Sequence, residues 1–250
     1  KKNLTNRSHH IMSAHRRIKS DNAQKKLELY RPVTAVIPCR KNYDFCPDVW
    51  NKKLAGKTLL ESSIEKCIKS DLFDHIVVAS DTPYVKDVMA CFNDPRLGFH
   101  ERTTRETIRS MRLNPTLEKL AASLDPESRG VTVIAYLQSP FVTTETLEEA
   151  IYTLVLNDAD CAFGVEEVCV PLFKRTGYGL QQINPAKGFS TDFDTIYKES
   201  NTSLATRNRN FKSGDLKGPV VVNFLVDRDE CFFINSEQSL RIAEILMENQ

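Results

Sequence analysis

The sequence contains no apolar run long enough to cross a membrane. No stretch approaches the ~18–20 consecutive apolar residues that a membrane-spanning helix needs. Residues 1–31 also contain no apolar segment of the kind found in secretory signal peptides. We therefore expect no membrane span and a cytoplasmic location.

The cysteines lack the spacing of a metal site or of a disulfide framework. The 7 cysteines are odd in number and scattered, and no two of them form a Cys-x-x-Cys pair. Several stand beside apolar residues, which predicts unpaired thiols packed in the core of a protein from a reducing compartment. They are Cys39, Cys46, Cys67, Cys91, Cys161, Cys169 and Cys231.

Glycine and proline are scarce, with 9 and 11 among 250 residues, which excludes collagen-like and low-complexity chains. The hydrophobic fraction of 41% is too high for a largely disordered chain, and the length is sufficient for a full core. We expect one globular domain, alone or with an appendage.

The net charge of +1 conceals an uneven distribution. Residues 1–31 carry a net charge of +7 and residues 32–250 a net charge of −6. We interpret residues 1–31 as a basic arm or linker that leads to a partner or to an upstream domain. Because it has neither interleaved aromatic residues nor a recognition-helix pattern, we do not expect it to bind nucleic acid.

Strand and helix patterns alternate along residues 32–250, which predicts βαβ units and a mainly parallel sheet between two layers of helices. Residues 171–218 have no clear periodicity. The expected strands are 33–38, 76–80, 131–137, 161–168, 219–226 and 231–234, and the expected helices are 20–30, 58–69, 83–92, 114–124, 144–157 and 236–248.

Ligands of such sheets bind beyond the carboxyl ends of the strands, which selects the loops 39–57, 81–83 and 138–144. The first loop contains a group of cations, among them Arg40 and Lys41, that suits a triphosphate. Asp81 begins the second loop and is a candidate Mg²⁺ ligand. In the third loop, the amide of Gln138 has the hydrogen-bonding groups to contact a base or a sugar.

Four short motifs occur in order along the body of the chain. They are residues 35–40 (AVIPCR), 53–60 (KLAGKTLL), 70–81 (SDLFDHIVVASD) and 137–140 (LQSP). This succession resembles the acylneuraminate cytidylyltransferases, which are CMP-sialic acid synthetases and relatives that act on other nonulosonates. The resemblance covers residues 33–250 and is strongest up to Asp81.

The resemblance implies a three-layer α/β/α, Rossmann-like nucleotidyltransferase fold in which residues 170–218 contact the sugar and form a small dimerisation excursion. It implies a homodimer that transfers CMP from CTP to an acidic sugar, with Mg²⁺ as cofactor and release of pyrophosphate. The implied catalytic residues are Arg40, Lys52 and Asp81; the nucleotide-binding residues are Pro38, Arg40, Lys41, Asn42, Lys53, Ser80 and Gln138; the sugar-binding residues are Arg175, Arg207 and Arg209; and the metal ligands are Asp81 and Asn235.

Two other hypotheses remain open. The closing Asp-x-Asp motif of the family falls on Phe233 and Asn235, which suggests a catalytically degenerate domain that serves as a binding or assembly module in a larger protein. The same kind of sheet also occurs in other nucleotidyltransferases and in glycosyltransferase-like enzymes.

Overall fold

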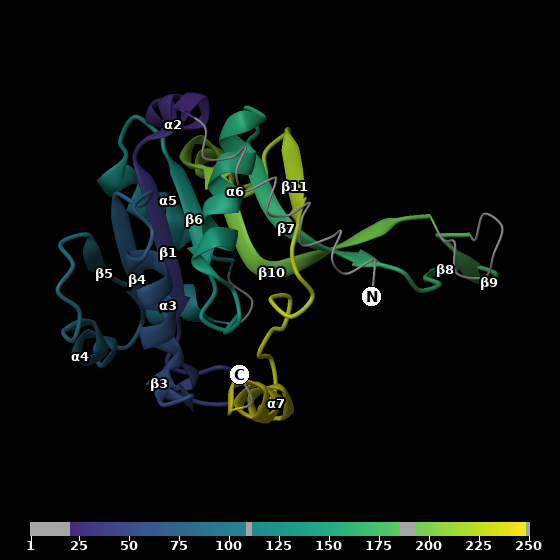
Figure 1. Ribbon diagram of the computed structural model, residues 1–250, viewed down its shortest axis with the longest axis horizontal. Coiled ribbons are helices and arrows are strands. Elements are labelled where there is room, and N and C mark those ends of the chain that lie inside the picture. Colours follow the sequence, from purple (N-terminus) through teal and green to yellow (C-terminus); the bar gives the residue numbers. More distant parts are fainter. Residues whose placement is uncertain (1–20, 109–111, 186–193, 249–250) are drawn as a thin grey trace.

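Figure 1 shows the computed structural model of the chain, which describes residues 21–108, 112–185 and 194–248. Within these residues a seven-stranded sheet has the order β11-β7-β10-β6-β1-β4-β5. Its strands are β1 (Val33–Cys39), β4 (His75–Ser80), β5 (Leu97–Glu101), β6 (Val131–Ala135), β7 (Cys161–Val168), β10 (Ile196–Arg207) and β11 (Val221–Leu225).

The central strand β1 consists almost wholly of buried residues, as expected for a strand that is covered on both faces. It pairs in parallel with β4 on one side and with β6 on the other. The pairs β4–β5 and β7–β11 are also parallel, whereas β10 runs antiparallel to both β6 and β7. The predicted mainly parallel sheet is therefore confirmed.

Helices cover both faces of the sheet, as the alternation of side chains along β1 requires. Ala35 and Ile37 belong to the core that packs under α3 (Leu59–Ile68) and α6 (Thr144–Leu156). Val36 points to the opposite face and packs with Leu117 of α5 (Asn114–Leu124). The remaining α-helices of the described residues are α2 (Asp21–Leu27), α4 (Val85–Met89) and α7 (Glu237–Glu248).

The described part of the basic arm packs on the domain. Helix α2 continues into a 3-10 turn, Glu28–Tyr30, and contacts α6. Leu27 and Tyr30 are buried in the main core, and Lys26 pairs with Asp158 at 2.8 Å. Residues 21–30 thus contribute to the core, while residues 1–20 lie outside the described residues.

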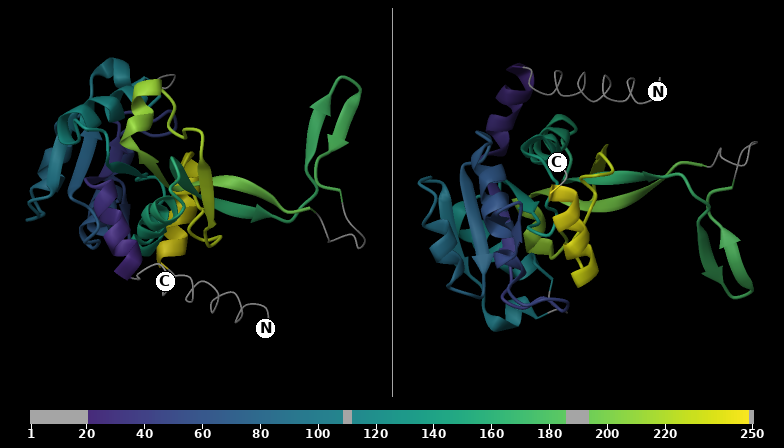
Figure 2. Two further views of the ribbon diagram at one scale, coloured as in Figure 1. Left: turned by 90° about the horizontal axis from the view of Figure 1, so that it is seen from above. Right: turned by 60° about the horizontal axis from the view of Figure 1, so that its bottom comes forward.

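A two-stranded ribbon extends far from the sheet, as Figures 1 and 2 show. It consists of β8 (Phe173–Thr176) and β9 (Gly179–Gln182), which pair antiparallel at the end of the extensions of β7 and β10. This region is where periodicity is absent from the sequence. Because both faces of the ribbon are exposed, its sequence needs no alternation of apolar and polar residues.

Three predictions about elements and thiols are wrong. Residues 231–234 form a turn and irregular backbone instead of a strand, because their aromatic side chains pack against neighbouring rings: Phe232 lies edge-on to Phe141 and Phe233 edge-on to Tyr136. The edge strand β5 was not predicted. Among the cysteines, Cys39, Cys46, Cys67 and Cys161 are buried as expected, Cys231 is partly buried, and Cys91 and Cys169 are exposed.

No helix of the described residues is both long and apolar enough to cross a bilayer.

Candidate active site

Three charged side chains follow three neighbouring parallel strands. Arg40 follows β1, Asp81 follows β4 and Arg102 follows β5. The backbone N–H of Arg102 donates to the carbonyl of Ser80 at 2.8 Å, so the ends of β4 and β5 remain bonded at this edge. The carboxyl ends of parallel strands meet at one edge of a sheet, which is where ligands of this type of fold bind.

The loop after β1 is bonded to the end of β4. The N–H of Lys41 donates to Oδ1 of Asp81 at 2.8 Å. Arg40 extends over the loop: its guanidinium carbon lies 4.8 Å from the centre of the Tyr43 ring, and its Nη1 donates to the carbonyl of Thr107 at 3.3 Å. The sequence therefore correctly placed Arg40, Lys41 and Asp81 together.

Most backbone amides that could contact an anion in this loop already have partners within the protein. Tyr43 and Cys46 exchange backbone hydrogen bonds with each other, and the N–H of Asp48 donates to the carbonyl of Lys41. Tyr43 and Trp50 are buried and join the loop to the core. An anion at this edge would therefore contact side chains more than a cradle of free amides.

Arg102 was not among the predicted site residues, yet it is almost fully buried. Its Nε donates to Oγ1 of Thr116 at 3.2 Å, and its Nη2 donates to the carbonyl of Glu106 at 2.5 Å. Burial lowers the pKa of Arg102, and the positive charge of Arg40 lowers it further. An anion beside these two guanidinium groups would relieve their repulsion, which favours the binding of an anion there.

Sequence reasoning missed Arg102 because its strand was missed. β5 has the sequence Leu-Gly-Phe-His-Glu, in which apolar and polar residues do not alternate. An arginine that follows a recognised strand would have been selected by the same rule that selected Arg40.

Gln138 follows β6 and is bonded to the segment before α7. Its carbonyl accepts the N–H of Ile234 at 2.8 Å, and its side-chain Nε2 donates to the carbonyl of Ile234 at 3.0 Å. The next residue, Asn235, is exposed, and its N–H donates to Oγ of Ser239. The structure thus places Asn235 next to a residue that is hydrogen-bonded to Gln138, a proximity that the sequence did not predict.

Lys52 and Lys53 lie where a small two-stranded ribbon begins, in the segment between β1 and α3. Lys52 follows the 3-10 turn Val49–Asn51, and Lys53 begins β2 (Lys53–Leu54), which pairs with β3 (Lys57–Thr58). Both lysines are exposed. Of the remaining predicted nucleotide residues, Pro38 and Ser80 stand near the ends of β1 and β4, and Asn42 lies in the loop after β1.

The three predicted sugar-binding arginines are not at this edge. Arg207 pairs with Val131, the first residue of β6, and therefore lies at the opposite edge of the sheet from Gln138. There it stacks 4.4 Å from the centre of the Tyr30 ring, while Arg209 pairs with Asp160 at 2.6 Å. Arg175 is on β8 in the projecting ribbon. The structure does not support a role for Arg207 or Arg209 in this site.

The residues present would suit a magnesium ion only if the nucleotide supplied most of its ligands. Asp81 offers one carboxylate, of which Oδ1 already accepts the Lys41 amide, and Asn235 offers a neutral amide. Among the described residues, no three His, Cys, Asp or Glu side chains gather as a metal site. Magnesium in nucleotide sites commonly uses one or two carboxylates together with phosphate oxygens.

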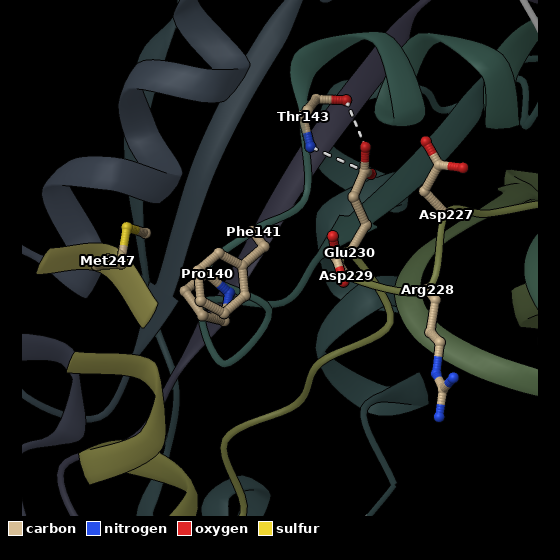
Figure 3. Close-up of a pocket in the computed structure, with 8 residues that line it drawn as sticks. All are labelled: Pro140, Phe141, Thr143, Asp227, Arg228, Asp229, Glu230 and Met247. Atoms are coloured by element: carbon tan, nitrogen blue, oxygen red, sulfur yellow. Dashed lines mark hydrogen bonds between the residues drawn. The ribbon is translucent and has the colours of Figure 1, made fainter. Parts of the chain in front are cut away.

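An acidic pocket of about 510 Å³ lies on the α6 side of the loop after β6. Figure 3 shows Glu230 pointing to Thr143, with which it forms two hydrogen bonds at the start of α6. The pocket also contains Asp227 and Asp229. Its negative charge makes it unsuitable for an anionic substrate.

Comparison with solved structures shows which folds the chain resembles. It matches 4-diphosphocytidyl-2C-methyl-D-erythritol synthase from Anaerococcus prevotii with a TM-score of 0.67 and 11% identity, over 90% of this chain and 99% of that one. It matches CMP:2-keto-3-deoxy-manno-octonic acid synthetase complexed with CTP with a TM-score of 0.64 and 13% identity, over 87% and 98%. These identities establish the fold alone. No curated protein matches the chain.

A family model described as "Cytidylyltransferase" matches residues 51–216, which is more than half of the chain. This stretch begins just before the ribbon of β2 and β3 and includes Asp81, Arg102 and Gln138. The chain therefore belongs to the cytidylyltransferase family and is a nucleotidyltransferase that carries out CTP-dependent cytidylyl transfer.

Proposed function

We propose that the chain transfers CMP from CTP to an acidic sugar of the sialic acid or nonulosonate class and releases pyrophosphate. The observation that carries the proposal is the pair of guanidinium groups, Arg40 and Arg102, at the carboxyl ends of β1 and β5. The acceptor class rests on the motifs of residues 53–60 and 70–81, which resemble those of enzymes acting on such sugars.

In this proposal, side chains of the protein hold the phosphates of CTP in place and neutralise their negative charge. Arg40 and Arg102 contact the triphosphate, and the exposed Lys52 and Lys53 add positive charge near the departing pyrophosphate. Asp81 maintains the loop by accepting the Lys41 amide, and its second oxygen is available to a magnesium ion. Gln138 stands beside the base or the acceptor.

The reaction is a displacement at the α-phosphorus. The anomeric hydroxyl oxygen of the sugar forms a bond to that phosphorus, the bond to the bridging oxygen of the β-phosphate breaks, and the hydroxyl proton passes to solvent. Magnesium, when bound with CTP, would screen the phosphate charges. Close placement of the two substrates supplies much of the rate enhancement.

A second candidate function is a domain that keeps the fold and the nucleotide site without catalysis. It is favoured by Phe233 and Asn235, because neither provides the carboxylate that the family motif has at those positions, and Phe233 packs against Tyr136. In this alternative, the chain binds a nucleotide or a partner within a larger assembly.

One experiment separates the two candidates. The chain is incubated with CTP, Mg²⁺ and a panel of acidic sugars, and pyrophosphate release is recorded beside the CTP-induced shift in melting temperature. We expect both release and a shift. A thermal shift without release from any sugar favours the second candidate, and a shift with UTP or GTP but not CTP contradicts the choice of nucleotide.

We further propose that the chain forms a homodimer through its projecting ribbon. The ribbon exposes the side chains of Phe173, Tyr178 and Leu180, which are 54%, 105% and 72% accessible. Such a group of exposed apolar residues is typical of an interaction surface. Arg175 would contact a sugar only if the ribbon reached the site of the second copy. Sedimentation of the Tyr178→Asp/Leu180→Asp variant should give a monomer, and an unchanged dimer would contradict this surface.

A cytoplasmic location is part of the same proposal, as is the role of the basic arm, residues 1–31, as a connection to a partner or to an upstream domain.

A further inference from the structure

The loop that follows β6 is bonded to α3 through a lysine side chain. Nζ of Lys66 donates to the carbonyl of Pro140 at 2.6 Å and to the carbonyl of Ser139 at 3.3 Å. The carbonyl of Lys66 in turn accepts the hydroxyl of Thr144 at 3.0 Å. One residue of α3 therefore contacts both ends of the segment 139–144.

Lys66 is partly buried, and few negative charges lie near its ammonium group. Among the described residues, no carboxylate lies within ion-pair distance of its Nζ; Glu230 acts on it from farther away and is itself bonded to Thr143 and Thr146. Lys66, Ser63 and Thr202 are among the residues that line a small cavity. Burial lowers the pKa of Lys66 to about 8.

An apolar side chain would occupy this position without the cost of removing a charge from water. Unlike an apolar group, the ammonium group of Lys66 forms directional hydrogen bonds, and two carbonyls of one loop accept them. These carbonyls belong to the two residues directly after Gln138. The path of the backbone through Ser139 and Pro140 therefore sets where Gln138 stands.

Other segments of the chain hold the same loop. Oγ of Ser139 donates to the carbonyl of Asn201 in β10 at 2.7 Å, and Gln138 exchanges two hydrogen bonds with Ile234. Lys66 supplies the third attachment, from the helix side. None of the three involves the predicted phosphate residues Arg40 and Asp81, so the Gln138 side of the site is supported separately from the phosphate side.

We propose that, of the base and the acceptor, Gln138 contacts the acceptor, and that Lys66 is a positioning residue for it, because Lys66 fixes the backbone of Ser139 and Pro140 and thereby the orientation of Gln138. The inference rests on the proposed function for its kinetic consequence. Its structural part, the attachment of the loop, stands on the hydrogen bonds alone.

The test compares Lys66→Met, Lys66→Arg and the control Lys69→Met. Lys69 is exposed at the end of the same helix. Hydrogen–deuterium exchange of peptides covering 136–147 reports on the loop, titration with CTP reports on the phosphate side, and steady-state kinetics give KM and kcat for the acceptor. We expect Lys66→Met to increase exchange in these peptides and to lower kcat/KM for the acceptor ~10-fold or more, with CTP affinity changed less than ~2-fold.

We expect Lys66→Arg to restore much of the protection and of the kcat/KM, and Lys69→Met to resemble the unsubstituted chain. Unchanged exchange in Lys66→Met overturns the proposal, and so does an equal loss of CTP affinity and acceptor kinetics, because that would show a general structural role. If the unsubstituted chain turns over no acidic sugar, the proposed function fails, and the exchange and CTP measurements still decide whether Lys66 holds the loop. If Lys66→Met does not fold, Lys66→Gln takes its place.

Discussion

The backbone amide of Lys41 donates a 2.8 Å hydrogen bond to Oδ1 of Asp81, which joins the loop after β1 to the end of the neighbouring strand β4. The same carboxylate is the acidic group that the sequence selects as a magnesium ligand. A single residue thus has two possible tasks, a structural one through Oδ1 and an electrostatic one through its charge.

Substitution at Asp81 separates these two tasks. Asparagine retains an oxygen that can accept the Lys41 amide but removes the charge, whereas alanine removes both. We expect Asp81→Asn to bind CTP nearly normally and to lose most turnover, and Asp81→Ala to lose CTP affinity as well, by ~10-fold or more, since hydrogen bonds to charged groups contribute about 1.5–3 kcal/mol. Calorimetric titration with CTP measures the affinity, and a pyrophosphate assay measures turnover. Equal effects of the two substitutions would argue that the charge has no separate role.

Arg102 should matter for nucleotide binding although it stands far from Arg40 in the sequence. Its burial and the nearby positive charge of Arg40 depress its pKa, so that a bound phosphate is expected to stabilise both groups. We expect Arg102→Ala to weaken CTP binding by ~10-fold or more. The control is Arg105→Ala, because Arg105 is exposed in the turn that follows. Equal CTP affinity of Arg102→Ala and Arg105→Ala would remove Arg102 from the site.

Glu106 stabilises the segment that carries Arg102, and its effect should depend on pH. Desolvation alone would raise the pKa of Glu106, but the Lys119 ammonium at 2.6 Å and the hydrogen bonds from Thr103 outweigh it and hold the pKa at about 2. Because the folded pKa is below the unfolded value, this stabilisation is complete above about pH 4.5 and is lost as the pH falls toward 2.

We therefore expect Glu106→Gln to lower the free energy of unfolding by about 2 kcal/mol at pH 7, and the difference from the unsubstituted chain to shrink as the pH approaches 2. Urea denaturation at several pH values measures it. Glu118→Gln, on the exposed side of α5, should have little effect. A difference that grows as the pH falls would contradict the assignment.

Residues 21–30 should contribute to folding stability. Tyr30 is 4% exposed, and its ring packs under Arg207 while its hydroxyl donates to Asp158. We expect Tyr30→Ala to lower the free energy of unfolding by about 3 kcal/mol, as is usual for the truncation of a buried aromatic residue. Leu29, next to it, is 71% exposed, so Leu29→Ala should change stability by less than about 0.5 kcal/mol. Similar denaturation curves for the two variants would show that this segment does not support the domain.

The sequence was informative where a strand is buried on both faces. β1, β4 and β6 are short apolar runs between polar loops, and this pattern is sufficient to place Arg40, Asp81 and Gln138 at one edge of the sheet. The arrangement of short motifs also identified cytidylyl transfer, which the family match supports.

The sequence was uninformative where contacts between distant segments decide the structure. β5 is an edge strand with a mixed composition, so Arg102 was missed. Phe232 and Phe233 form an apolar pair that is typical of a strand, but their rings pack against Phe141 and Tyr136 from irregular backbone. Arg207 was assigned to a sugar because arginine suits a carboxylate, whereas the antiparallel direction of β10 carries it to the opposite edge.

The most direct test of the account is the release of pyrophosphate from CTP by the purified chain in the presence of Mg²⁺ and acidic sugars, with Arg40→Ala and Arg102→Ala measured beside it. We predict sugar-dependent release with CTP that both substitutions strongly reduce. Absence of release with every acidic sugar, or release that both variants retain in full, would contradict it.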